Sequence, residues 1–170
     1  MKIASLSENL NLEKRVAIIP EMVKKYKSLG FEVLLPKNYG AHLGFDNEQY
    51  ISQGANIFEN YKDLLSDSDI VLQLDLPSDD NLSLLKENQN LIGVLNPFLN
   101  KEKLEKLSKR KINNFSLELL PRITRAQSMD ILSSQANLAG YKAVIESFAN
   151  FEKAIPVSYT HLTLPTICSV

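Results

Sequence analysis

The 170-residue chain has one cysteine, two histidines and no tryptophan. A single cysteine excludes an intrachain disulfide and agrees with a reducing compartment. The longest apolar runs have the length of strands, far below the roughly 18 residues of a membrane span. No secretory signal follows the N-terminal Met-Lys pair. The net charge of -1 gives no global basic field, so nucleic-acid binding is not indicated.

Several motifs that carry cofactor or metal chemistry are also missing. No two of the six glycines have the G-x-G spacing of a dinucleotide fingerprint, and there is no phosphate loop or CxxC pair. No cluster of His, Cys, Asp and Glu has the spacing of metal ligands, so no metal site is predicted. His42, between Gly40 and Gly44, is interpreted as a loop residue rather than a base.

Residues 157–170 have no Lys, Arg, Asp or Glu, although 23% of the chain is charged. Such a break in composition indicates a different origin, and the segment resembles the translated read-through of a sequencing adapter. The alternative, a metal or nucleophile pair formed by His161 and Cys168, is disfavoured. We therefore expect a native domain at residues 1–156, a non-native tail at 157–170, and a natural gene that continues past Pro156.

Short apolar segments alternate with amphipathic ones along residues 1–130. The predicted strands are residues 2–6, 31–35, 57–58, 70–74, 91–95 and 112–117. The predicted helices are residues 20–30, 47–53, 61–65, 82–87 and 101–110. This alternation predicts an α/β fold with a parallel sheet covered by helices on both faces.

A long helix is predicted from Ser133 to about Lys153. Ala136, Gly140, Val144 and Phe148 share one face of it, and we expect that face to belong to a core. Glycine in a helix interior costs roughly 1 kcal/mol against alanine, so close packing at this position would explain it.

Ligands bind such sheets beyond the carboxyl ends of the strands, and residues 121–130 follow a predicted strand. Arg122 would place positive charge near a carboxamide or phosphate, and Gln127 would donate to and accept from ribose hydroxyls or a carboxamide. Asp130 would accept from the same groups, and Ser133 would add a hydroxyl contact. The alternative, equally open, is that Arg122 pairs with Asp130 while Ser128 or Asp130 caps the helix.

Two other charged segments have structural alternatives. Arg15, within residues 13–20, would hold an anion in a fork or serve as a surface or structural residue. The run of six basic residues between positions 101 and 111 is interpreted as a solvated helix face.

Residues 121–130, PRITRAQSMD, and residues 132–144, LSSQANLAGYKAV, resemble the alpha subunit of proton-translocating NAD(P) transhydrogenase. Residues 13–20 resemble a motif shared with alanine dehydrogenase. The resemblance covers residues 1 to about 156 and implies the Rossmann- or flavodoxin-like first lobe of a two-lobed NAD(H)-binding component. It implies that the segment carrying Arg122, Gln127, Asp130 and Ser133 reaches the nicotinamide and its ribose.

The same resemblance places the main, glycine-rich NAD(H) site on a second lobe that this chain lacks. It implies a homodimer, an NADP(H)-binding component and a membrane proton-channel domain as partners. The location implied is cytoplasmic, at the inner face of a bacterial plasma membrane through those partners. Hydride transfer between two nicotinamides needs no side-chain acid or base, so no catalytic residue is expected. The chain alone is expected to be inactive.

Two other functions remain. An amino-acid oxidoreductase like alanine dehydrogenase would carry a lysine at the position of Asp75 and a histidine in the stretch 94–97, and this chain has neither. Arg15 matches the substrate-binding arginine of that family. The other function is a non-catalytic nucleotide-binding or assembly module.

Overall fold

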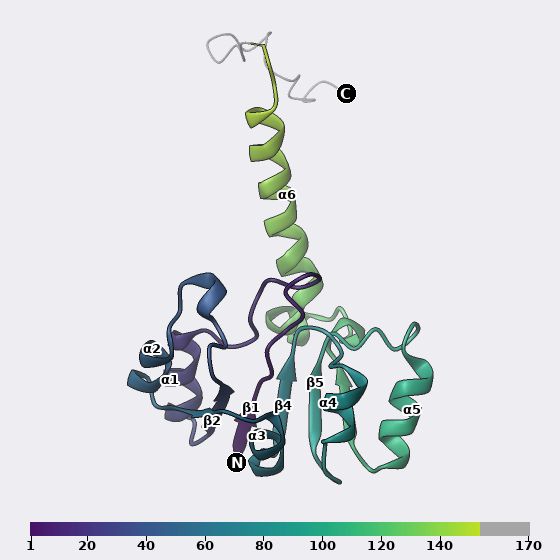
Figure 1. Cartoon of the computed structure of the whole chain (residues 1–170). Helices are drawn as coiled ribbons and strands as arrows, with labels where there is room; N and C mark the ends of the chain where they lie inside the picture. The colour runs from purple at the N-terminus through teal and green to yellow at the C-terminus, as the bar shows by residue number, and fades with distance from the viewer. Residues whose placement is uncertain (154–170) are drawn as a thin grey trace. The chain divides into compact units, whose positions relative to one another are not determined.

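The strands predicted from the alternating pattern form one parallel sheet in the order β3-β2-β1-β4-β5-β6 (Figure 1). The computed structural model describes residues 1–153. The strands are β1 (Lys2–Ala4), β2 (Glu32–Pro36), β3 (Ala55–Phe58), β4 (Ile70–Gln73), β5 (Asn90–Gly93) and β6 (Asn113–Ser116). This is the strand order of a Rossmann sheet, so the predicted fold class is confirmed.

The helices are α1 (Pro20–Ser28), α2 (Asn47–Ser52), α3 (Tyr61–Asp67), α4 (Asp79–Ser83), α5 (Lys101–Lys109) and α6 (Ile131–Ala149). Local sequence fixes several of their ends. Pro20 occupies the first turn of α1, and Gly30, with a φ of 86°, follows its end. Asp46 and Gln49 form a reciprocal capping box at the start of α2.

Two apolar clusters lie on opposite faces of the sheet, because neighbouring residues of a strand point in opposite directions. Ala4 and Leu34 belong to the cluster that includes Leu64 of α3, Leu82 of α4 and Leu107 of α5. The adjacent Ile3, Val33 and Leu35 belong to the cluster that includes Val23 of α1 and Tyr50 of α2. Helices α3, α4 and α5 therefore cover one face, and α1 and α2 cover the other, as predicted.

The two halves of the sheet are covered unequally. The face that α1 and α2 cover over β1–β3 continues across β4–β6 through Leu72, Ile92 and Phe115, which are register partners. Leu72 and Ile92 are only partly buried, and Phe115 on the edge strand is 52% exposed. The apolar cover of this half is thinner than that of β1–β3.

The boundaries of two predicted helices, at residues 82–87 and at 133 to about 153, are wrong. Helix α4 begins at Asp79 rather than residue 82, because Asp79 and Asp80 suit the positive end of a helix. It ends at Ser83, where the Arg110 guanidinium donates to the carbonyls of Leu82, Ser83 and Leu85.

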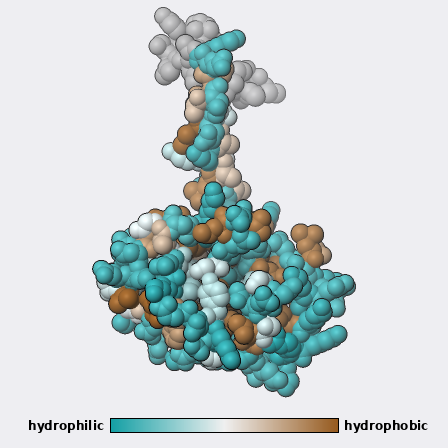
Figure 2. Space-filling view, viewed as in Figure 1, coloured by the Kyte–Doolittle hydropathy of each residue, from teal (hydrophilic) through white to brown (hydrophobic). Residues whose placement is uncertain are grey.

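Helix α6 runs from Ile131 to Ala149. It begins two residues before the predicted start at 133 and ends about four residues before the predicted end near 153. It lies in a separate compact unit that begins at Ile131, distinct from the unit Met1–Asp130. The face of Ala136, Gly140, Val144 and Phe148 is exposed, so the expected core face is not formed within the described residues. In Figure 2 this helix displays both hydrophilic and hydrophobic side chains. No helix among residues 1–153 has the length and apolarity needed to cross a bilayer.

Gly93→Ala tests the spacing of β4 and β5. A methyl group at this position would overlap the backbone carbonyl of Gln73, which cannot move without disturbing the ladder. We expect a loss of about 2–4 kcal/mol in unfolding free energy, measured by urea denaturation. The matched control is Gly140→Ala, where nothing described lies within 4 Å of the added methyl group. Equal stability of G93A and the parent chain would contradict the close approach of these strands.

Candidate functional site

The site is built at the carboxyl edge of the sheet, where the strand order reverses between β1 and β4. In sheets of this kind, the loops that leave two such strands diverge and open a crevice. Here the first loop follows Ala4 and runs to α1, and the second follows Gln73 and runs to α4.

Gln73 joins the ends of these two strands. Its side chain is 4% exposed, and its Oε1 accepts the backbone N–H of Leu6 at 2.7 Å and the hydroxyl of Ser5 at 3.2 Å. A buried amide that satisfies a backbone donor and a hydroxyl together fixes the spacing of both strand ends.

Tyr39 continues this network toward the loop before α1. Its hydroxyl lies 2.7 Å from the Ser5 Oγ and accepts the backbone N–H groups of Ala17 at 3.0 Å and Ile18 at 3.3 Å. Burial raises the pKa of Tyr39 well above its ordinary value, so the phenol stays neutral. The stretch 16–18 is thereby tied to the strand end.

A cavity of about 290 Å³ lies at this switch point. Acidic, amide and hydroxyl side chains from both loops line it, together with a few apolar ones: Ser7, Glu8, Asn9, Leu12, Glu13, Gln73, Asp75, Leu76, Pro77, Ser78 and Asn81. No lysine, arginine or histidine is among these residues, so the described wall is acidic rather than anion-binding.

Glu8 is the central acid of this wall. Its Oε1 accepts the backbone N–H of Leu74 at 2.7 Å, linking the first loop to the end of β4. Burial raises the pKa of the Glu8 carboxyl to about 7, against the backbone hydrogen bonds from Leu74 and Asp75 that lower it. The negative charges of Asp75 and Glu13 raise it further.

Arg15 is held within its own loop. Its Nε and Nη2 donate to the two carboxylate oxygens of Glu13 at 2.9 and 2.6 Å, a bidentate fork. The hydrogen bonds from Arg15 lower the pKa of Glu13. This geometry favours the structural interpretation of Arg15 over an anion fork aimed at a ligand.

The structure places three of the predicted binding residues on one short segment. Arg122 is exposed, Gln127 is exposed on the 3-10 helix η3 (Thr124–Met129), and Asp130 is partly buried directly before α6. Ala126, 5% exposed, anchors the segment, and its N–H donates to the carbonyl of Ile123 at 2.9 Å. The fourth residue, Ser133, lies in the first turn of α6 and is exposed within its own unit.

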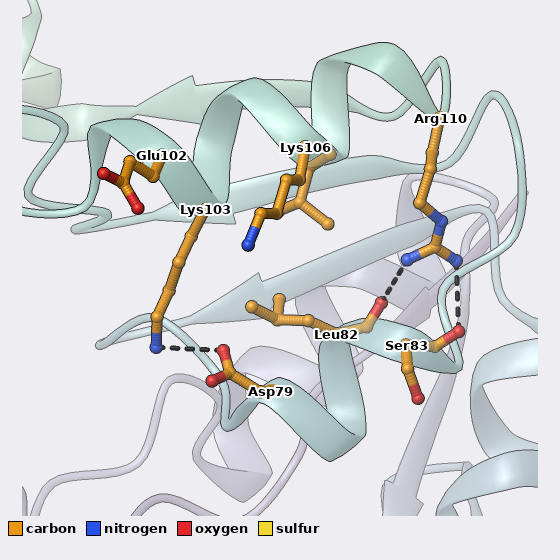
Figure 3. Close-up of a pocket in the computed structure, with 8 residues that line it drawn as sticks. Asp79, Leu82, Ser83, Glu102, Lys103, Lys106 and Arg110 are labelled. Carbon is orange, nitrogen blue, oxygen red and sulfur yellow. Dashed lines mark hydrogen bonds and ion pairs between the residues drawn. The ribbon is translucent and has the colours of Figure 1, made fainter.

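Figure 3 shows a second hollow, of about 460 Å³, between α4 and α5. Lys103 pairs with Asp79 at 2.9 Å across it, and the guanidinium of Arg110 is engaged by the end of α4. Lys101 and Lys111 also have acidic partners. These compensated charges agree with the interpretation of residues 101–111 as a solvated helix face.

Sequence reasoning missed Glu8, Tyr39 and Gln73. The only signal for Glu8 and Gln73 was their position at or just after an apolar strand; Tyr39 gave none, because its partners are distant in sequence. His42 is exposed, and its Nε2 lies 2.7 Å from the carbonyl oxygen of Lys14, consistent with a loop role. In the part of the chain described, no three His, Cys, Asp or Glu residues are placed to hold a metal.

Residues 5–139 match the family described as alanine dehydrogenase/PNT, N-terminal domain. The chain is 42% identical to the first of the polypeptides that make up NAD(P) transhydrogenase subunit alpha in Rhodospirillum rubrum, over 94% of this chain and 43% of that protein. It is 29% identical to alanine dehydrogenase 1 of Staphylococcus aureus, over 85% of this chain and 38% of that protein.

Among solved structures, a transhydrogenase from Sinorhizobium meliloti superposes with a TM-score of 0.84 at 36% identity. The superposition covers 92% of this chain and 46% of that one. The chain thus spans less than half the length of the proteins it resembles.

Tyr39→Phe tests the network that ties the loop to the sheet. Removal of the hydroxyl leaves the N–H groups of Ala17 and Ile18 and the Ser5 hydroxyl without this partner. We expect a loss of about 2–3 kcal/mol in unfolding free energy by urea denaturation. Tyr50→Phe, which removes one hydrogen bond to the Ile18 carbonyl, is the matched control and should cost about 1 kcal/mol. A smaller loss in Y39F than in Y50F would refute the assignment.

Proposed function

Because the chain belongs to the alanine dehydrogenase/PNT N-terminal domain family, we propose that it forms the first lobe of the NAD(H)-binding component of a proton-translocating transhydrogenase. The family predicted from the sequence is confirmed, with relatives named as NAD(P) transhydrogenase alpha subunits. The proposed whole protein transfers hydride between NAD(H) and NADP(H) and couples the transfer to proton translocation.

The position of Asp75 is the main reason to propose a transhydrogenase component rather than an enzyme that oxidises amino acids. Asp75 is half-buried in the wall of the switch-point cavity, beside Glu8 and Glu13. An enzyme that oxidises alanine binds the amino acid and releases the keto acid, and an acidic wall repels the carboxylate that both of them carry. A carboxylate also cannot polarise the substrate carbonyl as a lysine would.

Asn96 supports the same choice. It stands in the stretch where alanine dehydrogenase would carry its histidine. Its backbone N–H donates to Glu118 Oε1 at 2.6 Å, and it has a positive φ of 47°. An asparagine amide does not exchange protons near neutral pH, so no acid or base is supplied there.

The residues proposed to act on the cofactor do so by position. The nicotinamide ring supplies the hydride chemistry when NAD(H) is bound. Arg122, Gln127, Asp130 and Ser133 would orient the carboxamide and ribose through charge and hydrogen bonds. The short 3-10 helix η3 is anchored by the buried Ala126. Such an anchored helix can hold polar side chains at a fixed spacing, as a positioning role requires.

The remainder of the system is proposed from the relatives. A second lobe would carry the main NAD(H) site, and NADP(H) would bind a partner component. A second copy of the chain and a membrane proton-channel domain would complete the assembly, placing it in the cytoplasm at the inner face of the membrane. A non-catalytic nucleotide-binding module is the alternative of a different class, and hydride-transfer assays separate the two.

Substitutions in the segment 121–130 test the positioning role. In a chimera that joins residues 1–156 to the remainder of the Rhodospirillum rubrum relative, Gln127→Ala and Arg122→Ala should each slow NADH-dependent reduction of an NADP analogue about tenfold or more. The measurement uses the cognate NADP(H)-binding component of that relative. Arg125→Ala, an exposed arginine of the same segment, is the matched control and should be nearly silent.

Equal losses of hydride-transfer rate in R122A and R125A would contradict a specific role for Arg122. An unaltered chimera that folds, binds NADH and transfers no hydride would favour the non-catalytic module.

The activity of the chain alone is a separate expectation. Tested alone, residues 1–170 should transfer no hydride and should show no micromolar NADH binding in a fluorescence titration, because the proposal places the main NAD(H) site on a second lobe. The chimera should not oxidise alanine at any NAD⁺ concentration, because Asp75 replaces the lysine that such a reaction needs. Alanine oxidation by the chimera would contradict the proposed transhydrogenase function and favour an enzyme like alanine dehydrogenase.

A further inference from the structure

The side chain of Gln73 has one possible orientation of its amide group. Its oxygen accepts the backbone N–H of Leu6 at 2.7 Å, and a backbone N–H can only donate, so the amide oxygen and nitrogen cannot be exchanged. The hydroxyl of Ser5 donates to the same oxygen at 3.2 Å. Both contacts engage the oxygen, so the Nε2 nitrogen, which carries two protons, occupies the other branch of the amide.

The Nε2 nitrogen of Gln73 is a donor without an acceptor at the wall of the switch-point cavity. Gln73 is 4% exposed and lines this cavity, and its Nε2 donates to no group among residues 1–153. In that range, Asn114 Oδ1 and Glu118 Oε2 are the side-chain atoms that lack both a partner and contact with solvent. Gln73 Nε2 therefore keeps contact with the cavity. Because buried polar groups are normally paired, a ligand atom that accepts from Nε2 would complete this wall.

The other walls of the cavity carry acceptors and negative charge. Glu8 extends from the loop after β1, and Asp75 extends from the loop after β4. Asp75 Oδ1 accepts the N–H of Leu76 at 2.8 Å, and its Oδ2 has no partner in the described part of the chain. The Arg15 fork neutralises Glu13, but no lysine, arginine or histidine of residues 1–153 lines the cavity to neutralise Glu8 or Asp75.

A ligand that satisfies both kinds of wall needs an acceptor atom and a positive charge. The acceptor would receive the Nε2 protons of Gln73, and the cation would offset the carboxylates of Glu8 and Asp75. A metal ion does not fit, because no three His, Cys, Asp or Glu residues in the described range are placed to hold one. An ammonium group fits better, since it donates three hydrogen bonds and requires no fixed coordination geometry.

We propose that the switch-point cavity binds a small organic cation in which a primary ammonium and a hydroxyl or carbonyl oxygen stand on adjacent carbons, as in an amino alcohol. The ammonium lies between the carboxylates of Glu8 and Asp75, and the oxygen accepts from Gln73 Nε2. The cavity volume of about 290 Å³ suits a molecule of this size. The site uses none of residues 121–130, so it adds a second ligand to the proposed function.

The test is an NMR titration of the 170-residue chain with four probes of similar size, at constant ionic strength. Ethanolamine carries both groups, ethylamine lacks the oxygen, ethylene glycol lacks the charge, and glycolate reverses the charge. The titration is made at about pH 8, above the Glu8 pKa of about 7, so that the carboxylate is ionised while the amines are protonated.

Ethanolamine should shift the amide resonances of Leu74 and Leu76 and the side-chain NH₂ resonances of Gln73. We expect it to bind about tenfold more tightly than ethylene glycol and roughly threefold more tightly than ethylamine. Glycolate should cause no shift. Equal affinity for ethanolamine and glycolate, or no shift with ethanolamine, would overturn the proposal. Equal affinity for ethanolamine and ethylamine would overturn the role of Gln73.

Two substitutions test the acidic wall. Asp75→Asn and Glu8→Gln each remove one charge and keep an oxygen acceptor, and each should weaken ethanolamine binding about tenfold. Asp80→Asn makes the same change at an exposed aspartate of α4 that does not line the cavity, and it should bind ethanolamine as the parent chain does. An equal loss in D75N and D80N would show a general effect of charge and refute the site.

A direct measurement keeps the proposal falsifiable if a variant does not fold. In the parent chain saturated with ethanolamine, nuclear Overhauser effects should connect the ligand methylene protons to the Gln73 NH₂ protons. Their absence at saturation would place the ligand elsewhere and overturn the proposal. No nucleotide takes part, so failure here leaves the proposed transhydrogenase function standing, and a chimera without hydride transfer leaves this site standing.

Discussion

The hydrogen bonds of the Gln73 side chain set the geometry on which the carboxyl edge depends. They hold the end of β4 to the end of β1, the two strands between which the sheet reverses its order. The Ser5 hydroxyl is hydrogen-bonded to the Tyr39 hydroxyl, which in turn accepts the backbone N–H groups of Ala17 and Ile18. A shift of either strand end would therefore move the loop that carries Glu13 and Arg15, along with the cavity below it.

The carboxyl edge divides into two regions of different chemistry. The cavity between β1 and β4 is lined by Glu8, Glu13 and Asp75, whose negative charges disfavour an anionic ligand. The segment after β6 presents Arg122 and Gln127, the latter on the 3-10 helix η3. A dinucleotide suits the second region better than the first, because its phosphates are anionic while its carboxamide and ribose offer neutral hydrogen bonds.

Periodicity and turn residues predicted most of the fold. All six strands were placed within two residues because their apolar runs are short and bounded by Gly, Pro, Asn or charged residues. The α4 boundary was missed because its end is fixed by Arg110, which lies far along the chain. The exposure of Phe115 and of the α6 face was not predictable, since periodicity identifies an apolar stripe but not whether anything covers it.

Sequence patterns predicted a binding segment with Arg122, Gln127, Asp130 and Ser133. The family is established by the comparisons, and the roles of these four residues stay predictions. The acidic cavity was not anticipated as a unit. Asp75 was recognised only as a substitution for a lysine, because its neighbour Glu8 is 67 positions away in the chain. Long-range polar contacts of this kind leave no periodic signal.

The reversal of strand order has a consequence for synthesis on the ribosome. Strands β1, β2 and β3 pair within the first part of the chain, but the other edge of β1 has no partner until Ile70 and Val71 emerge. During that interval the nascent chain presents an open strand edge beside the apolar residues Ile3 and Ala4. Recruitment of a chaperone, or pausing of translation before β4 has left the exit tunnel, would bear most strongly on this interval of assembly.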